Sequence, residues 1–169
     1  MTFRSSTTVR FAAGFAVLLW ISCGSGGAST SGGTTPPPGT CQNPLPSPIS
    51  NPRFATDLLP VLQATCGSAS SSCHGAVTVP SGHFSFATGT GRTAQNVFDD
   101  LVNAPPSNAP SGFMRVKPGD LAHSWLIEKV SSDQPGGLGY GARMPLQGQN
   151  LCTSTIDNLK TWIQNGALF

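Results

Sequence analysis

The chain has 169 residues, a length that suits one domain with additional segments. Only 9% of the residues are charged, whereas 20 are glycine and 15 are proline, so we expect a few helices within much irregular chain. Two of the nine basic residues, Arg4 and Arg10, precede an apolar run, and the other seven balance the seven acidic residues, which excludes a nucleic-acid-binding or polybasic membrane surface.

Residues 1–22 are predicted to be an export signal. The apolar run Phe11–Ile21 follows the two arginines and is too short to span a bilayer. It ends at Ser22-Cys23-Gly24, which resembles the lipobox of bacterial lipoproteins and predicts lipidation of Cys23 as the first mature residue. Ordinary cleavage nearby is the alternative, and either outcome exports the chain to an oxidising compartment.

Residues 23–52 have the composition of a tether. They are rich in Gly, Ser and Thr and then in Pro, including the run Pro36-Pro37-Pro38. Such a segment buries too little apolar area to fold, and its prolines favour extended polyproline II structure. The sequence therefore predicts a disordered tether that separates a lipid-bearing end from a folded domain at residues 53–169.

A candidate cofactor motif lies near the start of this domain. Cys66 and Cys73 are followed directly by His74, an order typical of covalent haem attachment, in which two thiols form thioethers and the imidazole binds the iron. Six residues separate the cysteines instead of the usual two, although Gly, Ser and Ala in this spacer allow a flexible loop. The alternative is a small disulfide loop between Cys66 and Cys73.

Four stretches of the domain have the apolar spacing of helices. The first leads into Cys66, and we expect Asp57 to cap its N-terminus so that Pro60 lies in the first turn, where no N–H partner is lost. The second is expected to start after an N-cap at Thr93 and to stop before Pro105.

The third and fourth helices complete a mainly α prediction. The third is expected after Pro118-Gly119-Asp120, with the aspartate as its N-cap. The fourth is expected to begin near Thr153 or Ser154 and to end at Asn165-Gly166, a helix stop signal. One short alternation of apolar residues around residue 85 is not enough for a sheet.

The order of these features resembles the cytochrome c-like domains of exported proteins from planctomycetes and myxobacteria. The residues that carry the resemblance are the apolar helix into Cys66, then Cys73-His74-Gly75, His83-Phe84-Ser85-Phe86, Val116-Lys117-Pro118-Gly119-Asp120, Arg143-Met144-Pro145 and the last helix with Trp162-Ile163 and Gly166-Ala167. The resemblance covers nearly all of the domain. It implies a small helical domain with long irregular loops and one haem c.

The same resemblance implies the roles of four residues. Cys66 and Cys73 would hold the haem, His74 would be the proximal iron ligand and Met144 the distal one. The glycine-rich segment before Met144 is long enough to wrap across a haem face. Three rivals for the distal position, each with a more ordinary structural role, are Met114, His83 and His123.

The remaining cysteines suggest a disulfide. If haem takes Cys66 and Cys73, and Cys23 is lipidated, then Cys41 and Cys152 are left to pair, as exported thiols normally do. Without haem, two disulfides satisfy the same count, so the number of cysteines does not decide between the alternatives.

Together these features predict an exported electron carrier and not an enzyme. The expected location is the bacterial periplasm or cell envelope, with a lipid anchor in the outer membrane, and the expected partners are redox proteins. The chain contains no Ser-His-Asp set, paired carboxylates or phosphate-binding loop. The main alternative is a haem-free, disulfide-stapled binding or structural module. A minor one is a zinc site made by Cys66, Cys73, His74 and His83.

Overall fold

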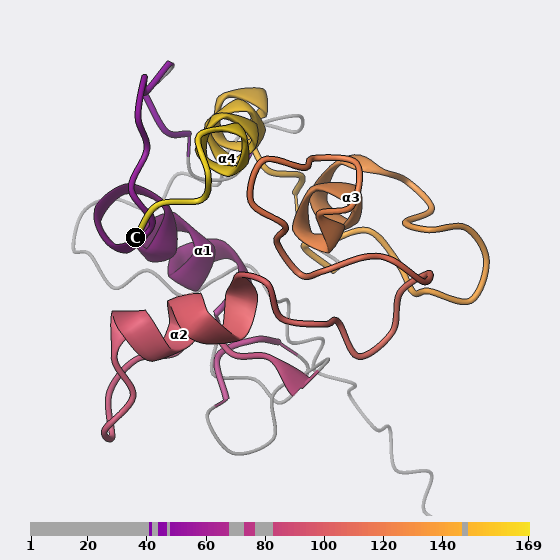
Figure 1. Ribbon diagram of the computed structural model, residues 1–169, viewed down its shortest axis with the longest axis horizontal. Coiled ribbons are helices and arrows are strands. Elements are labelled where there is room, and N and C mark those ends of the chain that lie inside the picture. The colour runs from indigo at the N-terminus through magenta and orange to yellow at the C-terminus, as the bar shows by residue number, and fades with distance from the viewer. Residues whose placement is uncertain (1–40, 42–43, 47, 68–72, 77–82, 147–148) are drawn as a thin grey trace, which may run out of the picture.

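The computed structural model describes residues 41, 44–46, 48–67, 73–76, 83–146 and 149–169. A π-helical turn, η1 (Phe54–Leu58), continues into α1 (Leu59–Cys66), and α2 (Ala94–Leu101), α3 (Trp125–Ser131) and α4 (Thr153–Gln164) follow along the chain (Figure 1). The described residues contain isolated β-bridges but no strand. The predicted mainly α fold is therefore confirmed, whereas the predicted signal segment and Cys23 lie outside the described residues.

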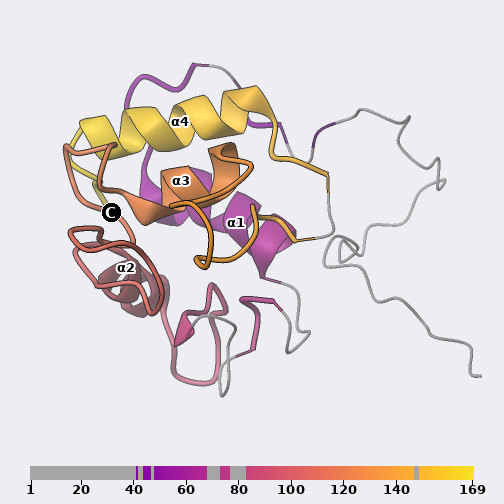
Figure 2. The ribbon, with the colours of Figure 1, turned by 90° about the vertical axis from the view of Figure 1, so that its right-hand side faces the viewer.

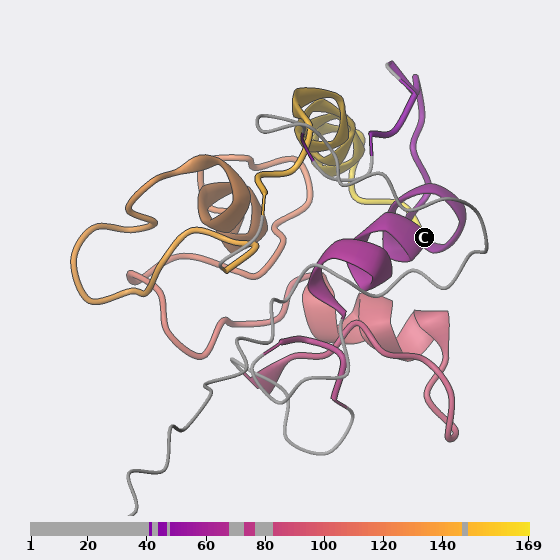
Figure 3. The ribbon, with the colours of Figure 1, turned by 180° about the vertical axis from the view of Figure 1, so that it is seen from behind.

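The helices are arranged around α1. α4 lies on one side of α1 and α2 on the other, and the three views agree on this order (Figures 1, 2 and 3). α3 packs against α4, and η1 packs against α2. The described residues between α1 and α2 and between α3 and α4 lie mostly in loops, and these residues line the site.

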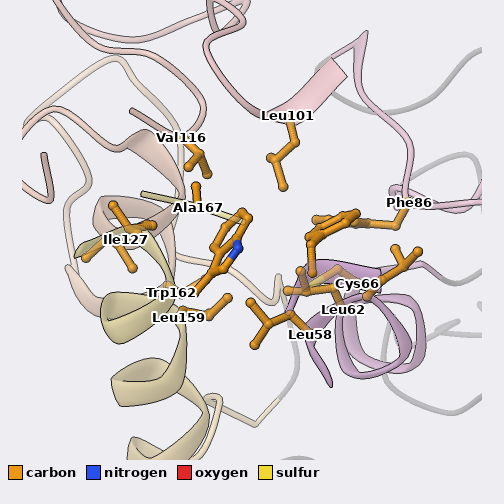
Figure 4. Close-up of a cluster of buried hydrophobic side chains, with 14 of the residues drawn as sticks. Leu58, Leu62, Cys66, Phe86, Leu101, Val116, Ile127, Leu159, Trp162 and Ala167 are labelled. Carbon is orange, nitrogen blue, oxygen red and sulfur yellow. The ribbon is translucent and has the colours of Figure 1, made fainter. Parts of the chain in front are cut away.

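The core is centred on Trp162 of α4, which is completely buried (Figure 4). Its indole ring stacks on Phe54, with ring centroids 5.6 Å apart, and its Nε1 donates to the carbonyl of Leu168 at 2.8 Å. The Phe54 amide donates to the same carbonyl at 3.1 Å. The C-terminal segment is thereby attached to the first turn of the domain. The buried side chains around this centre include Leu58, Leu62, Val97, Leu101, Val116, Val130, Leu159 and Ile163.

The first helix begins earlier than predicted. The amide of Leu58 donates to the carbonyl of Arg53, five residues back, so the chain is already helical before Asp57. Asp57 does not cap α1, because its carboxylate accepts instead from the amide of Arg53 at 2.7 Å. Pro60 is the second residue of α1 and so lies in its first turn, as predicted.

The predictions for α2 and α4 are confirmed. Thr93 caps α2: its side chain accepts from the amide of Asn96, and the Asn96 side chain accepts from the amide of Thr93. This reciprocal capping box satisfies two donors that the helix itself leaves free. α4 ends at Gln164, and Gly166 follows with a φ of 91°, the left-handed conformation that commonly ends a helix.

The predicted start of α3 is wrong. α3 begins at Trp125, with Ser124 at the N-cap position, and Asp120 heads a separate turn in which its carboxylate accepts from the amide of His123. The amide of Trp125 donates to the carbonyl of Met114 at 2.8 Å. This bridge to a neighbouring segment takes a donor that a helix starting at Asp120 would have used internally.

The last part of the predicted tether is bound to the domain. The amide of Leu45 donates to Thr155 Oγ1 at 3.2 Å, and the amide of Ile49 donates to Asn158 Oδ1 at 2.9 Å. Asn158 in turn donates to the carbonyl of Pro46 at 2.8 Å. Polar side chains of α4 thus hold a proline-rich segment that has little apolar surface of its own. Leu45, Pro46 and Ile49, which lie before the predicted start of the domain at residue 53, are therefore bound to α4.

A disulfide joins Cys41 to Cys152, which are 111 positions apart. This is the pair that the sequence left over once Cys66 and Cys73 were assigned to haem. It attaches the segment before η1 to the N-terminus of α4. A bridge that closes a loop of about 100 residues is expected to stabilise a domain by about 4.7 kcal/mol through the entropy of the unfolded chain, and measured effects are often smaller.

Candidate functional site: an apolar pocket at the end of α1

The segment with the two cysteines folds back on α1. Cys66 is the last residue of α1, and its carbonyl accepts from the amide of His74 at 2.9 Å. The His74 carbonyl then accepts from the amide of Phe86 at 2.7 Å. Residues 68–72 of the spacer lie outside the described residues. The two backbone bonds nevertheless place His74 beside the end of α1 despite the unusual length of the spacer.

The orientation of the His74 ring is set by a hydrogen bond. Its Nδ1 lies 2.9 Å from the carbonyl oxygen of Phe84, and because a carbonyl oxygen only accepts, Nδ1 carries the proton. Nε2 is then the nitrogen with a lone pair for a metal, as in histidine ligands whose other nitrogen is bonded to a backbone carbonyl. Phe84 and Phe86 are in edge-to-face contact, with their ring centroids 4.7 Å apart. Their centroids lie 6.1 and 6.0 Å from that of the His74 imidazole.

The two cysteines of the motif are in different states. Cys66 is a free thiol, buried beside Phe86 at the edge of the core (Figure 4). Burial raises the pKa of the Cys66 thiol, and a hydrogen bond with Thr65 opposes this only in part, so the thiol is protonated at neutral pH. Cys73 is buried and disulfide-bonded, and its bond does not involve Cys66. The predicted alternative of a Cys66–Cys73 disulfide is therefore wrong for this structure.

Met144 reaches the same region from the loop between α3 and α4. Its amide donates to the carbonyl of Lys129 at 2.7 Å, which fixes the loop to the last turn of α3. The Met144–Pro145 peptide bond is cis, and Pro145 is buried while Met144 is half-buried. The described residues therefore include all four predicted haem-binding positions.

These four residues line one cavity of about 350 Å³. Its volume lies within the range of pockets that hold small molecules and cofactors. The walls come from the end of α1, the segment of Phe84 and Phe86, the segment before α3, α3 itself and the loop that follows it. Its other apolar lining residues include Phe84, Phe86, Leu101, Trp125, Leu126 and Val130.

Two cations that the sequence analysis missed, Arg115 and Lys129, also line the pocket. Burial lowers the pKa of both, and for Arg115 the nearby charge of Asp100 opposes the effect. Among the described residues neither cation forms an ion pair. Arg115 donates to the carbonyls of Asp100 and His83 and lies over the Phe84 ring at 5.4 Å. No local pattern distinguishes these two from other basic residues, because only the fold brings them together.

The three rival distal ligands do not line this pocket. His83 and His123 are exposed, and His123 Nδ1 pairs with Asp120 at 2.7 Å. Met114 is half-buried in a backbone bridge to Ser124. The described residues also contain no group of three His, Cys, Asp or Glu side chains placed to hold a metal, which leaves the zinc alternative without support.

No family model, curated protein or solved structure matches this chain. None of the helices in the described part is long and apolar enough to cross a membrane.

Proposed function

We propose that this pocket holds one covalently attached haem c and that the protein transfers single electrons between redox partner proteins. The observation that carries the proposal is the convergence of Cys66, Cys73, His74 and Met144 on one apolar cavity, although Met144 lies far along the chain. These residue types are those that attach and ligate haem in c-type cytochromes. The role remains that of an electron carrier and not of an enzyme.

The residues of the pocket fit a haem in three respects. The aromatic and aliphatic walls suit the flat apolar body of a porphyrin. His74 offers Nε2 as a proximal ligand because Nδ1 is bonded to Phe84, and Met144 offers a soft thioether on the distal side. Arg115 supplies positive charge and forms no ion pair among the described residues, which suits a haem propionate.

Attachment requires both cysteines as thiols. Each thiol adds across a haem vinyl group, so that a carbon–sulfur bond forms and the thiol hydrogen moves to the neighbouring carbon. Cys66 is already a thiol, whereas Cys73 is disulfide-bonded and must first be reduced by a cellular dithiol. Bound haem would supply the one-electron chemistry, and the chain would supply ligands, orientation and a water-poor surrounding.

Visible absorption of the full-length protein from a host with haem-attachment machinery tests the proposal. We expect a Soret band that survives acid–acetone extraction, since thioether-bound haem stays with the protein. Replacing both Cys66 and Cys73 by alanine should abolish this resistant absorption, because no thioether can then form. The matched control is Cys41→Ser with Cys152→Ser, which removes a disulfide away from the motif and should keep the band. A colourless wild-type protein would overturn the proposal.

The distal ligand has its own test. Met144→Ala should leave the amount of attached haem unchanged, because Cys66, Cys73 and His74 are untouched, while the methionine-to-iron charge-transfer band of the oxidised protein disappears and the reduction potential falls. Met114→Ala is the matched control and should keep the band. Survival of the band in Met144→Ala would make Met144 a packing residue.

We also propose that Cys23 is lipidated and anchors the exported protein at the outer membrane. The support is the sequence pattern alone, since Cys23 lies outside the described residues. Cys23→Ser should keep the folded domain and move the protein from the membrane fraction to the soluble fraction, because the acyl chains are lost. A mutant that stays with the membrane after signal cleavage would contradict the anchor.

The second candidate is a haem-free module stapled by disulfides that binds another anionic, apolar molecule in the same pocket. The disulfide-bonded state of Cys73 favours this candidate, because a disulfide and a thioether exclude each other. The same absorption measurement separates the two. Haem-free protein in which Cys73 remains disulfide-bonded by mass mapping would support the second candidate.

A further inference from the structure

The loop that carries Met144 contains little that would order it by itself. Gly136, Gly137, Gly139 and Gly141 all have positive φ values between 65° and 96°. Glycine loses more conformational freedom on folding than other residues, so four of them make this loop costly to order. Its fixed position beside the pocket must come from contacts with the rest of the domain.

Lys129 makes three of these contacts. Its Nζ donates to the carbonyl of Ala142 at 2.6 Å and to that of Tyr140 at 3.3 Å, and its own carbonyl accepts from the amide of Met144 at 2.7 Å. One residue of α3 therefore binds the loop at positions 140, 142 and 144. The ammonium group also lies 5.6 Å from the ring centroid of Trp125, which itself contacts Tyr140 edge to face at 6.3 Å.

The contacts of the Lys129 side chain are almost all with the loop that carries Met144. The side chain is half-buried and lies in no ion pair of the described residues. Hydrogen bonds from a charged donor are stronger than those between neutral groups. Other contacts of the loop lie on either side of positions 140 and 142: the Gly136 amide donates to Glu128 Oε1 at 3.1 Å, Asn108 donates to the Gly139 carbonyl at 3.2 Å, and Arg143 donates to the Val130 carbonyl at 3.2 Å.

We propose that Lys129 is the positioning residue for Met144. Its ammonium group gathers the carbonyls of the glycine-rich loop, and its backbone carbonyl holds the Met144 amide, so that the thioether is presented to the pocket. The identity of what Met144 binds rests on the proposed haem function, whereas the holding of the loop does not. A substitution at Lys129 should therefore change the distal side of the site and leave the attachment side intact.

The first test uses the full-length protein with its haem. Lys129→Met keeps the apolar stem and removes the donors, and we expect the methionine-to-iron charge-transfer band to fall to less than half while attached haem per chain stays constant. Lys129→Arg keeps charged donors and should retain most of the band. Lys160→Met is the matched control, because Lys160 is on α4 in an exposed pair with Asp157. An unchanged band in Lys129→Met would overturn the inference.

The second test does not depend on iron. Amide hydrogen exchange of residues 137–146 should be at least about tenfold faster in Lys129→Met than in the wild type, since the loop opens more often without the hydrogen bonds of the ammonium group. Exchange should be unchanged in Lys160→Met. Unaltered exchange would overturn the inference whatever the haem content. If the wild type carries no haem but exchange still rises, the haem proposal fails and the positioning of Met144 stands. Lys129→Gln serves as the second variant if Lys129→Met gives too little folded protein.

Discussion

The core and the pocket of this domain are built in different ways. The core around Trp162 is filled by side chains from helix faces and the C-terminal segment, and Trp162 itself has no exposed surface. The pocket is bounded mainly by loops and by the ends of α1 and α3, and it keeps a volume of about 350 Å³ between apolar walls. Helix faces interlock closely, whereas loops fixed by backbone hydrogen bonds leave apolar surface without a partner. This difference is the feature on which the proposed haem site rests.

Two tryptophans give the largest expected effect and test this contrast directly. Trp162→Ala should lower the free energy of unfolding by about 3–5 kcal/mol, because it leaves a cavity in a closed core. Trp125→Ala should cost less in protein without haem, because the indole of Trp125 lines an existing cavity. Urea unfolding of both variants measures the difference, and equal losses would contradict the distinction between the two regions.

Removal of the long-range disulfide is the next test. Replacing Cys41 and Cys152 by serine should lower the free energy of unfolding by about 2–5 kcal/mol, since the unfolded chain regains the freedom that a 111-residue separation restricts. The effect should fall on the core side, where the bridge attaches Cys41 to the N-terminus of α4. Thermal unfolding under non-reducing conditions measures it. A changed haem spectrum in this double variant would mean that the two regions are more tightly coupled than the contacts suggest.

Two adjacent glycines sharpen the comparison on the pocket side. Gly136 and Gly137 both have positive φ, so an alanine at either position costs roughly 1–2 kcal/mol in backbone strain. A Cβ at Gly136 would also lie 2.9 Å from Pro110 and from Trp125, whereas a Cβ at Gly137 meets nothing within 4 Å. We therefore expect Gly136→Ala to destabilise more than Gly137→Ala in chemical unfolding. The reverse order would show that the loop is not packed against the pocket wall as described.

The smallest effect concerns the turn between the two regions, where the amide of Gly119 donates to the carbonyl of Ile163 on α4. Hydrogen bonds from Lys117 and then from His123 lower the pKa of the Asp120 carboxyl to about 2. Because the pKa is lowered in the folded state, this carboxylate stabilises the turn above its ordinary pKa, and the contribution is lost as the pH falls from about 4 towards 2.

Asp120→Asn should therefore have a slightly lower thermal midpoint than the wild type at pH 6, and the difference should vanish near pH 2. Asp157→Asn is the control, because Asp157 pairs only with Lys160 at 3.8 Å on the surface. Since Asp120 is accessible to solvent, 1 M salt should reduce the difference as well. A difference that grows as the pH falls would have the opposite sign and would exclude this role for the carboxylate.

The helices were predictable to different degrees. α2 and α4 begin and end near the predicted residues, because Thr93 and the Asn165-Gly166 pair act through local geometry. α3 starts at Trp125 and not after Asp120. An aspartate can cap a helix or begin a turn, and the hydrogen bond from the Trp125 amide to the Met114 carbonyl favours the turn at Asp120. The apolar stripe of the first helix begins at Phe54, where η1 starts, but the predicted N-cap at Asp57 was wrong, since a π turn has no simple sequence pattern.

The site was predictable in its chemistry but not in its surroundings. Cys66, Cys73, His74 and Met144 were identified from residue types and order, and the structure brings them to one cavity. Arg115 and Lys129 could not be identified from residue types and order. They lie in separate parts of the chain, and only the fold brings both to the wall of the pocket. Nor did residue types and order show that Cys73 is disulfide-bonded while Cys66 is free.

By itself the sequence determined the mainly α character, the N-cap of α2 and the stop of α4, because these follow from spacing and local chemistry over a few positions. The assignment of Cys66, Cys73, His74 and Met144 to haem came from the resemblance and stays a prediction. Only the tertiary structure decided that Leu45, Pro46 and Ile49 bind α4, that His74 folds back on Cys66 and that Lys129 holds the loop of Met144. Each of these contacts joins residues that meet only when the whole domain is packed, and the spacing of residues over a few positions of the sequence does not specify that packing.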